Sequence, residues 1–164
     1  MGVLPYERNL WIEEEDAVSL EGKSEVPPPG HLDIAVILLP RISNATDFQI
    51  LAEEPGVSVR MIRRLEEFGE PDLLILPGTK ATLADITYLK MKGFANKIRD
   101  YAAGGGRVLG VCGGFQILGL TIEDPEAVES NKVLESGLSL LPVRTIFSRE
   151  KTLQRVRGRV KNEI

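Results

Sequence analysis

The sequence predicts an α/β fold in which a parallel sheet carries helices on both faces. Short apolar runs alternate with segments of helical periodicity after residue 31. Two of these runs close on proline, in "DIAVILLP" (33–40) and "PDLLILPGTK" (71–80). Strands that alternate with helices require parallel pairing and right-handed crossovers, which gives the predicted class.

Four strands are predicted from these runs. The segment 33–40 is continuously apolar, which is typical of a strand buried on both faces. Residues 57–62, "VSVRMI", show the alternation of a short strand. The apolar segments 73–76 and 107–111 complete the predicted sheet.

A helix is predicted between the first two strands, over 43–56. Ser43 and Asn44 are its candidate N-caps, and Pro55–Gly56 ends it. The segment "RRLEEFG" (63–69) indicates a brief helical turn after the second strand.

The clearest helix signal begins at Thr82 and ends at the glycines 104–106. Thr82 and Asp85 are three residues apart, as in a capping box with Asp in the Glu position. Phe94 and Ile98 recur on one helical face, and the glycines that follow are typical of a helix end. A further helix is expected after the strand 107–111.

Charge and composition exclude several classes of function. The 164-residue chain has a net charge of −4, whereas a nucleic-acid or anionic-membrane surface needs a basic patch. The basic run 149–161 is interpreted as the solvated face of a helix. No apolar stretch reaches the length of a membrane span, and no secretory signal is apparent. A single cysteine fits a reducing compartment, so a cytoplasmic location is expected.

The chain is predicted to contain one connector and one domain. Residues 1–30 are acidic, lack clear periodicity and end in "PPPG", which suits an extended connector. Residues 31–164 are expected to form a single domain, because a chain of this length supports one hydrophobic core.

The only cysteine, Cys112, lies in "GVCGG", directly after the strand predicted at 107–111. This G-x-C-x-G pattern is a version of the nucleophile elbow, in which Gly110 and Gly114 remove Cβ atoms that would clash. Amides at the start of the next helix would favour the thiolate and could receive an oxyanion. The alternatives are a small buried hydrophobe and a phosphate-binding turn, although no Walker lysine or G-x-G-x-x-G follows.

A second turn is expected beside this elbow. The carboxyl ends of parallel strands meet at one edge of the sheet, and "LPGTK" (76–80) ends the strand at 73–76. The candidate oxyanion donors are the amide of Gly113 and that of Gly78 or Thr79.

The general base is not apparent at this edge. The only histidine, His31, comes directly before the first strand and so at the opposite edge of the sheet. We expect it to be a surface or packing residue.

At these residues the chain resembles the glutamine amidotransferase domain of the cobyric acid synthase family, a class I (triad) amidotransferase of cobalamin biosynthesis. The resemblance covers essentially the whole chain, and "EEEDAVSLE" is similar to the family's acidic segment between two domains. The other similar blocks are "LDIAVILLPRISNATDF", "PDLLILPGTKATLAD", "GGRVLGVCGGFQILG" and "GLSLLPVRTIFSREKTLQRVRG". The resemblance implies an incomplete flavodoxin-like class I amidotransferase fold.

The resemblance also implies a glutamine-hydrolysing amide ligase in the full-length protein. Cys112 would attack the side-chain amide of glutamine and form a γ-glutamyl thioester, with the amides of Gly78 and Gly113 holding the oxyanion. Gln116 and Thr79 would contact the bound glutamine. The ammonia would amidate carboxylates of a corrinoid, while a separate N-terminal synthetase domain binds ATP and Mg²⁺. This domain itself would bind no cofactor and no metal.

By the same resemblance the chain is expected to be a fragment. The family's catalytic histidine lies beyond the block that matches 150–158, and the synthetase domain would precede the connector. We expect the chain alone to be inactive, because a triad enzyme without its base loses several orders of magnitude in rate. Missing strands would leave apolar surface exposed and favour self-association.

Other functions stay open from the sequence. A related amidotransferase subunit acts on cell-wall lipid intermediates and shares the elbow. A catalytically dead scaffold or interaction module would fit the missing histidine, and a stand-alone thiol hydrolase or redox sensor could use the same fold. The expected partners are glutamine and, through the synthetase domain, a corrinoid; neither nucleic acid nor a membrane is expected.

Overall fold

The computed structural model describes residues 27–150, 155, 157 and 158. Most of the predicted connector 1–30 and most of the basic run 149–161 therefore lie outside the described residues. Within the described part of the chain, no helix has the length and apolar character needed to cross a bilayer.

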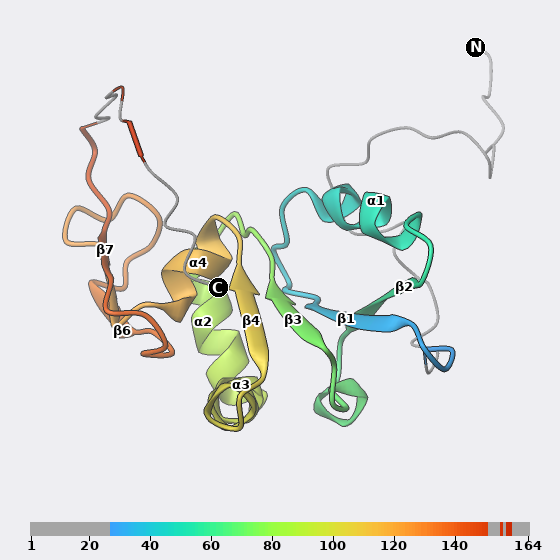
Figure 1. Ribbon diagram of the computed structural model, residues 1–164. Coiled ribbons are helices and arrows are strands. Elements are labelled where there is room, and N and C mark those ends of the chain that lie inside the picture. The colour runs from blue at the N-terminus through green and yellow to red at the C-terminus, as the bar shows by residue number, and fades with distance from the viewer. Residues whose placement is uncertain (1–26, 151–154, 156, 159–164) are drawn as a thin grey trace, which may run out of the picture.

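The main sheet has four parallel strands in the order β2-β1-β3-β4 (Figure 1). Helices flank it, so the predicted α/β class is confirmed. β1 and β3 are central and almost fully buried, as their continuous apolar runs require. All four predicted strands are confirmed: β1 (Leu32–Ile37), β2 (Val57–Ile62), β3 (Leu73–Leu76) and β4 (Arg107–Gly110).

The strand order creates a switch point between β1 and β3. From β1 the chain passes to β2 on one side, and it then returns across the sheet to β3 and β4 on the other. In open α/β sheets, ligands bind outside the carboxyl ends of the strands at such a point. The turns after β1, β3 and β4 therefore surround the place where a site is expected.

The helix predicted over 43–56 is much shorter in the structure. It consists of η2 (Ala45–Phe48) and one turn of α1 (Gln49–Ala52). Asn44 occupies the N-cap position with φ 53° and makes no side-chain capping bond. Pro55 disfavours helical backbone in the residue before it, which explains the early end. The brief turn predicted at 63–69 is confirmed as η3 (Leu65–Glu67).

The prediction of a single long helix from Thr82 is wrong, because the structure has two helices in this segment. α2 (Thr82–Met91) and α3 (Phe94–Ala103) are separated at Gly93, whose φ of 82° lies in the left-handed region. Glycine adopts this conformation without the steric cost that a Cβ would bring. The break lets Phe94 be buried, and α3 ends at the predicted glycines.

The predicted capping box is also wrong. Ala81 is the N-cap of α2, and Asp85 does not reach back to it with its side chain. The carboxylate of Glu129 instead accepts the N–H groups of Thr82 and Leu83 at 2.7 and 2.8 Å. A distant carboxylate therefore satisfies two of the free amides of this helix.

A second, three-stranded sheet follows α4 (Gly113–Leu118) and lies on the side of α4 away from β1 and β2 (Figure 1). Its middle strand β5 pairs antiparallel with β6 and parallel with β7. The sequence did not predict these strands, since three residues are too few for a periodic signal. They are β5 (Thr121–Glu123), β6 (Leu134–Ser136) and β7 (Arg144–Ile146).

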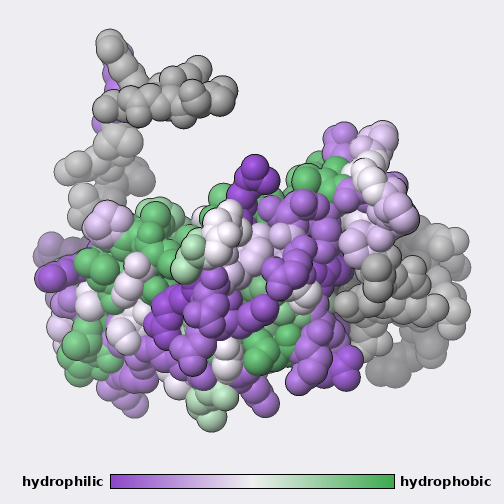
Figure 2. Space-filling model, turned by 60° about the horizontal axis from the view of Figure 1, so that its bottom comes forward, coloured by the Kyte–Doolittle hydropathy of each residue, from purple (hydrophilic) through white to green (hydrophobic). Residues whose placement is uncertain are grey.

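β4 is an edge strand whose outer side is unpaired among the described residues. The side chains of Leu109 and Val111 are 47% and 38% exposed there. Apolar side chains also interrupt the polar surface on the face seen in Figure 2. An open edge with exposed apolar groups is a surface on which a further segment or another chain could pair.

One carboxylate ties the second sheet to α2. Glu135 on β6 forms ion pairs with Lys90 of α2 and with Lys132. Partial burial alone would raise its pKa, but the hydrogen bonds from Lys132 and Lys90 outweigh this effect. The pKa of Glu135 is lowered from 4.5 to about 2.

Replacing Glu135 by Gln should make the stability of the protein less sensitive to acid. Since folding lowers the pKa of Glu135, its carboxylate stabilises the protein fully above pH 4.5 and loses this effect as the pH falls towards 2. We expect the free energy of unfolding to fall over this range, and Glu135→Gln to remove part of the fall. Denaturant unfolding followed by circular dichroism at a series of pH values measures it.

Glu54→Gln, at an exposed position after α1, is the matched control and should keep the parental pH dependence. An unchanged pH dependence in Glu135→Gln would contradict a stabilising role for the two lysine pairs.

Candidate functional site: the Cys112 elbow

Cys112 has a backbone conformation that non-glycine residues rarely adopt. Its φ is 49° and its ψ −112°, between the end of β4 and the start of α4. Such conformations cost about 1–3 kcal/mol and persist only where the surrounding structure imposes them. The residue is exposed, so the structure has an accessible thiol on a strained strand-to-helix turn.

Two glycines make this turn sterically feasible. A Cβ added to Gly114 would lie 2.0 Å from the carbonyl oxygen of Leu76, and one added to Gly110 would lie 2.7 Å from Cα of Phe115. Neither neighbour can move easily, because both atoms belong to the backbone of packed elements. The prediction that these positions need glycine agrees with this geometry.

The turn 76–80 lies against the elbow, as the sequence predicts. A Cβ added to Gly78 would lie 3.6 Å from Cβ of Cys112. One added to Gly113 would lie 2.5 Å from Cγ2 of Thr79 and 3.2 Å from its backbone nitrogen. The two turns therefore meet at the carboxyl edge of the sheet.

Backbone N–H groups gather where these turns meet. Those of Gly78, Thr79 and Gly113 form no hydrogen bond with another described residue. Unpaired N–H groups beside a nucleophile can bind an oxyanion or a carbonyl oxygen. The three candidate donors named from the sequence are thus brought together.

The hydroxyl of Thr79 is used in hydrogen bonds within the protein. Its hydroxyl donates to Oδ2 of Asp85 at 2.5 Å and accepts the N–H of Ala81 at 3.0 Å. Asp85 is fully buried and also lies 3.4 Å from Nη1 of Arg41. Burial raises the pKa of Asp85, although the hydrogen bond from Thr79 and the charge of Arg41 oppose this shift.

Gln116 lies one helical turn after Cys112 and is half-buried. Its Oε1 accepts the hydroxyl of Thr82, the first residue of α2, at 3.2 Å. This contact places the amide group of Gln116 between the elbow helix and the start of α2. Its predicted contact with glutamine stays a prediction.

His31 lies where the sequence places it, at the amino end of β1. It is exposed, and its Nδ1 is 3.2 Å from Oγ of Ser58. Cys112 follows the carboxyl end of β4 in the same parallel sheet, so the two side chains are at opposite edges. His31 cannot act on the thiol in this fold.

Sequence reasoning did not place the loop after β1 or the side chain of Asp85 beside the turn 76–80. The N–H of Ser43 donates to the carbonyl of Gly78 at 2.9 Å, and that of Lys80 donates to the carbonyl of Arg41 at 2.9 Å. The position of this loop at the carboxyl end of a central strand was the signal that could have found it. No group of three or more His, Cys, Asp or Glu side chains in the described part of the chain could hold a metal ion.

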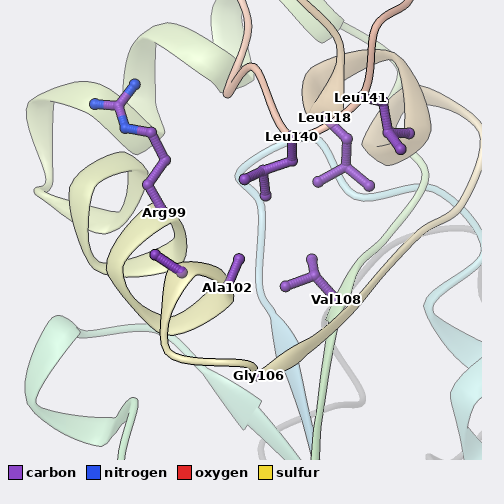
Figure 3. A pocket seen from close by; sticks show the side chains of 8 residues that line it. Arg99, Ala102, Gly106, Val108, Leu118, Leu140 and Leu141 are labelled. Carbon is purple, nitrogen blue, oxygen red and sulfur yellow. The ribbon is translucent and has the colours of Figure 1, made fainter.

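A pocket of about 390 Å³ lies apart from the elbow, between α3, β4 and the segment before β7. Ala102, Val108 and Leu140 point towards one another across it, and the guanidinium of Arg99 points away (Figure 3). None of its lining residues belongs to the turns at 76–80 and 110–114. The pocket is lined mainly by apolar side chains and adjoins β4, whose outer edge pairs with no strand in the described part of the chain.

Comparison with known proteins finds one matching family. Residues 33–164 match the CobB/CobQ-like glutamine amidotransferase domain. The chain is similar to cobyric acid synthases of Sorangium cellulosum (52% identity over 98% of this chain), Listeria monocytogenes (50% over 96%) and Desulforudis audaxviator (48% over 96%). It spans 31% of the length of each of these relatives.

Gly114→Ala should strongly destabilise the protein, because its new Cβ would overlap the carbonyl of Leu76. We expect a loss of about 3 kcal/mol in the free energy of unfolding, the upper range for overpacking. Gly158→Ala is the control, since a Cβ there meets nothing within 4 Å. Denaturant unfolding measures both, and a loss in Gly114→Ala no larger than in Gly158→Ala would contradict the close packing of the elbow on β3.

Proposed function

Because the chain belongs to the CobB/CobQ-like glutamine amidotransferase domain family, we propose that Cys112 is the nucleophile that releases ammonia from glutamine. The observation that carries this proposal is the elbow, which exposes a thiol at φ 49° and ψ −112° beside N–H groups that bind no described residue. A cysteine that only filled space would need neither the strain nor the exposure.

The reaction proceeds through a thioester. The thiolate sulfur of Cys112 adds to the side-chain carbonyl carbon of glutamine, and a tetrahedral oxyanion forms. The C–N bond then breaks as the nitrogen receives a proton, ammonia leaves and a γ-glutamyl thioester remains. Water attacks the thioester, which releases glutamate and regenerates the thiol.

The N–H groups where the two turns meet stabilise the oxyanion. Those of Gly78 and Gly113 are the proposed donors, and the N–H of Thr79, which binds no described residue, lies on the same turn as Gly78. Gln116 contributes to glutamine binding through its side-chain amide. These groups are fixed before the substrate arrives, which is the condition for efficient electrostatic catalysis.

The proton carrier comes from outside the described site. The sequence contains a single histidine, His31, and it lies at the opposite edge of the sheet. We therefore expect the protein to use a base from a segment or chain that packs beside Cys112. The outer edge of β4, which pairs with no described strand, leads directly to the elbow and offers a place for such packing or for self-association.

The names of the relatives support a proposal for the destination of the ammonia. They are cobyric acid synthases of which this chain spans 31%. We propose that the ammonia amidates corrinoid carboxylates activated by ATP and Mg²⁺ in a separate synthetase domain. The complete protein is then a carbon–nitrogen ligase with glutamine as the amido donor.

Cys112→Ala should abolish glutamine-dependent amidation in the protein at its full encoded length, because no other group replaces the sulfur. We expect a fall of at least about three orders of magnitude, typical for the loss of a nucleophile. Amidation with ammonium salt in place of glutamine should continue at the parental rate. Amide formation in both reactions is measured by mass spectrometry of the corrinoid.

The ammonium reaction is the internal control for folding and for the synthetase step. Retained glutamine-dependent activity in Cys112→Ala would contradict the nucleophile, and equal loss of both activities would contradict a role confined to ammonia supply.

The 164-residue chain alone should hydrolyse glutamine very slowly, since its only histidine cannot reach Cys112. Ammonia release by the purified chain, compared with the full-length encoded protein, measures this difference. Turnover by the isolated chain at the rate of the full-length protein would refute the requirement for a base from elsewhere.

A further inference from the structure

We propose that Asp85 is a positioning residue for the oxyanion-binding turn, acting through Thr79 and making no contact with glutamine. This inference rests on the proposed function, in which N–H groups of the turn 76–80 bind the oxyanion. Asp85 lies in the first turn of α2 and has no exposed surface. A buried carboxylate is costly unless its partners compensate for the lost hydration, so its bonds indicate what it holds in place.

Those bonds connect Asp85 to both walls of the site. Oδ2 accepts the hydroxyl of Thr79 at 2.5 Å, and Oδ1 lies 3.4 Å from Nη1 of Arg41. The carbonyl of Arg41 in turn accepts the N–H of Lys80 at 2.9 Å. Asp85 therefore holds Thr79 directly and holds the next residue of the turn through the loop after β1.

The hydrogen-bonding pattern fixes the rotamer of Thr79. Its Oγ1 accepts the N–H of Ala81, so its one hydroxyl proton is available for Asp85. Its Cγ2 lies 2.5 Å from the position of a Cβ on Gly113, and so packs against that glycine. Rotation about χ1 would break a bond to a buried charge or move the methyl group off Gly113.

Thr79 therefore transmits the constraint to the backbone of the turn that lies against the elbow. The backbone nitrogen of Thr79 lies 3.2 Å from the same Cβ position on Gly113. A Cβ added to the neighbouring Gly78 would lie 3.6 Å from Cβ of Cys112, so this residue of the turn also lies against the elbow. Loss of the Asp85 charge would let the turn shift, and displacement of oxyanion donors by about 1 Å is enough to reduce a rate by about 100-fold.

The test measures glutamine hydrolysis by the protein at its full encoded length in four single variants and in the double variant Asp85→Asn/Thr79→Val. Asp85→Asn removes the charge at nearly constant volume, Thr79→Val removes the hydroxyl and Thr79→Ser retains it. Asp33→Asn is the matched control, because Asp33 is another buried carboxylate paired with an arginine, Arg60, but at the amino edge of the sheet. The rate of Cys112 alkylation by iodoacetamide is followed by mass spectrometry as a reaction that needs no oxyanion site.

We expect Asp85→Asn and Thr79→Val each to lower kcat by about 10- to 100-fold, with a much smaller change in KM. The double variant should be no worse than the single ones, since both changes break the same link. Thr79→Ser should retain more activity than Thr79→Val. Asp33→Asn should keep the parental kcat, and the alkylation rate should stay within about twofold of the parent in Asp85→Asn.

Two results would overturn the inference in distinguishable ways. If the parent hydrolyses glutamine and both Asp85→Asn and Thr79→Val keep its kcat, the positioning role is wrong while the proposed function stands. If the parent at full length hydrolyses no glutamine, the proposed function fails and the inference fails with it. Should Asp85→Asn not fold, as judged by circular dichroism, Thr79→Val alone decides.

Discussion

The backbone of Cys112 is held in a conformation that it would not adopt by itself. Its φ of 49° and ψ of −112° persist because α4 is packed directly onto the ends of β3 and β4. Gly110 and Gly114 allow that approach, since a side chain at either position would overlap backbone atoms. Every proposed feature of the site depends on this packing: the exposure of the sulfur, the direction of α4 and the contact with the turn 76–80.

A set of hydrogen-bonded carboxylates, of which Asp85 and Asp124 are buried, supports the elbow. Asp85 fixes Thr79 and the loop after β1, and Glu129 satisfies the first N–H groups of α2. Glu129 is itself placed by Asp124, whose carboxylate accepts three consecutive N–H groups of its loop, including that of Glu129 at 2.8 Å. These carboxylates connect α2 with the turn 76–80 and with the loop after β5. The two buried ones, Asp85 and Asp124, would be costly to bury without their partners.

The features that could be predicted from the sequence are those with a local signal. β1 and β3 are continuous apolar runs between turn residues, and glycines two positions either side of Cys112 mark a tight strand-to-helix turn. The two strands and this turn were therefore predicted correctly. Features that depend on distant partners were missed. Glu129 caps α2 at Thr82, which lies 47 residues earlier in the chain. The spacing of Asp85 from Thr82 suggests a helix cap, but its carboxylate instead accepts the hydroxyl of Thr79 in the turn before α2. The strands of the second sheet are too short to show a period.

The claim on which the proposed chemistry depends is that the sulfur of Cys112 becomes bonded to the side-chain carbonyl carbon of glutamine. The most direct measurement is rapid acid quenching of the full-length encoded protein after mixing with isotope-labelled glutamine, followed by mass spectrometry of the peptide that contains residues 107–119. A labelled γ-glutamyl group on Cys112, formed and lost at rates that match ammonia release, is the predicted result. Ammonia release without any label on Cys112, or with the label on another residue, would contradict the mechanism.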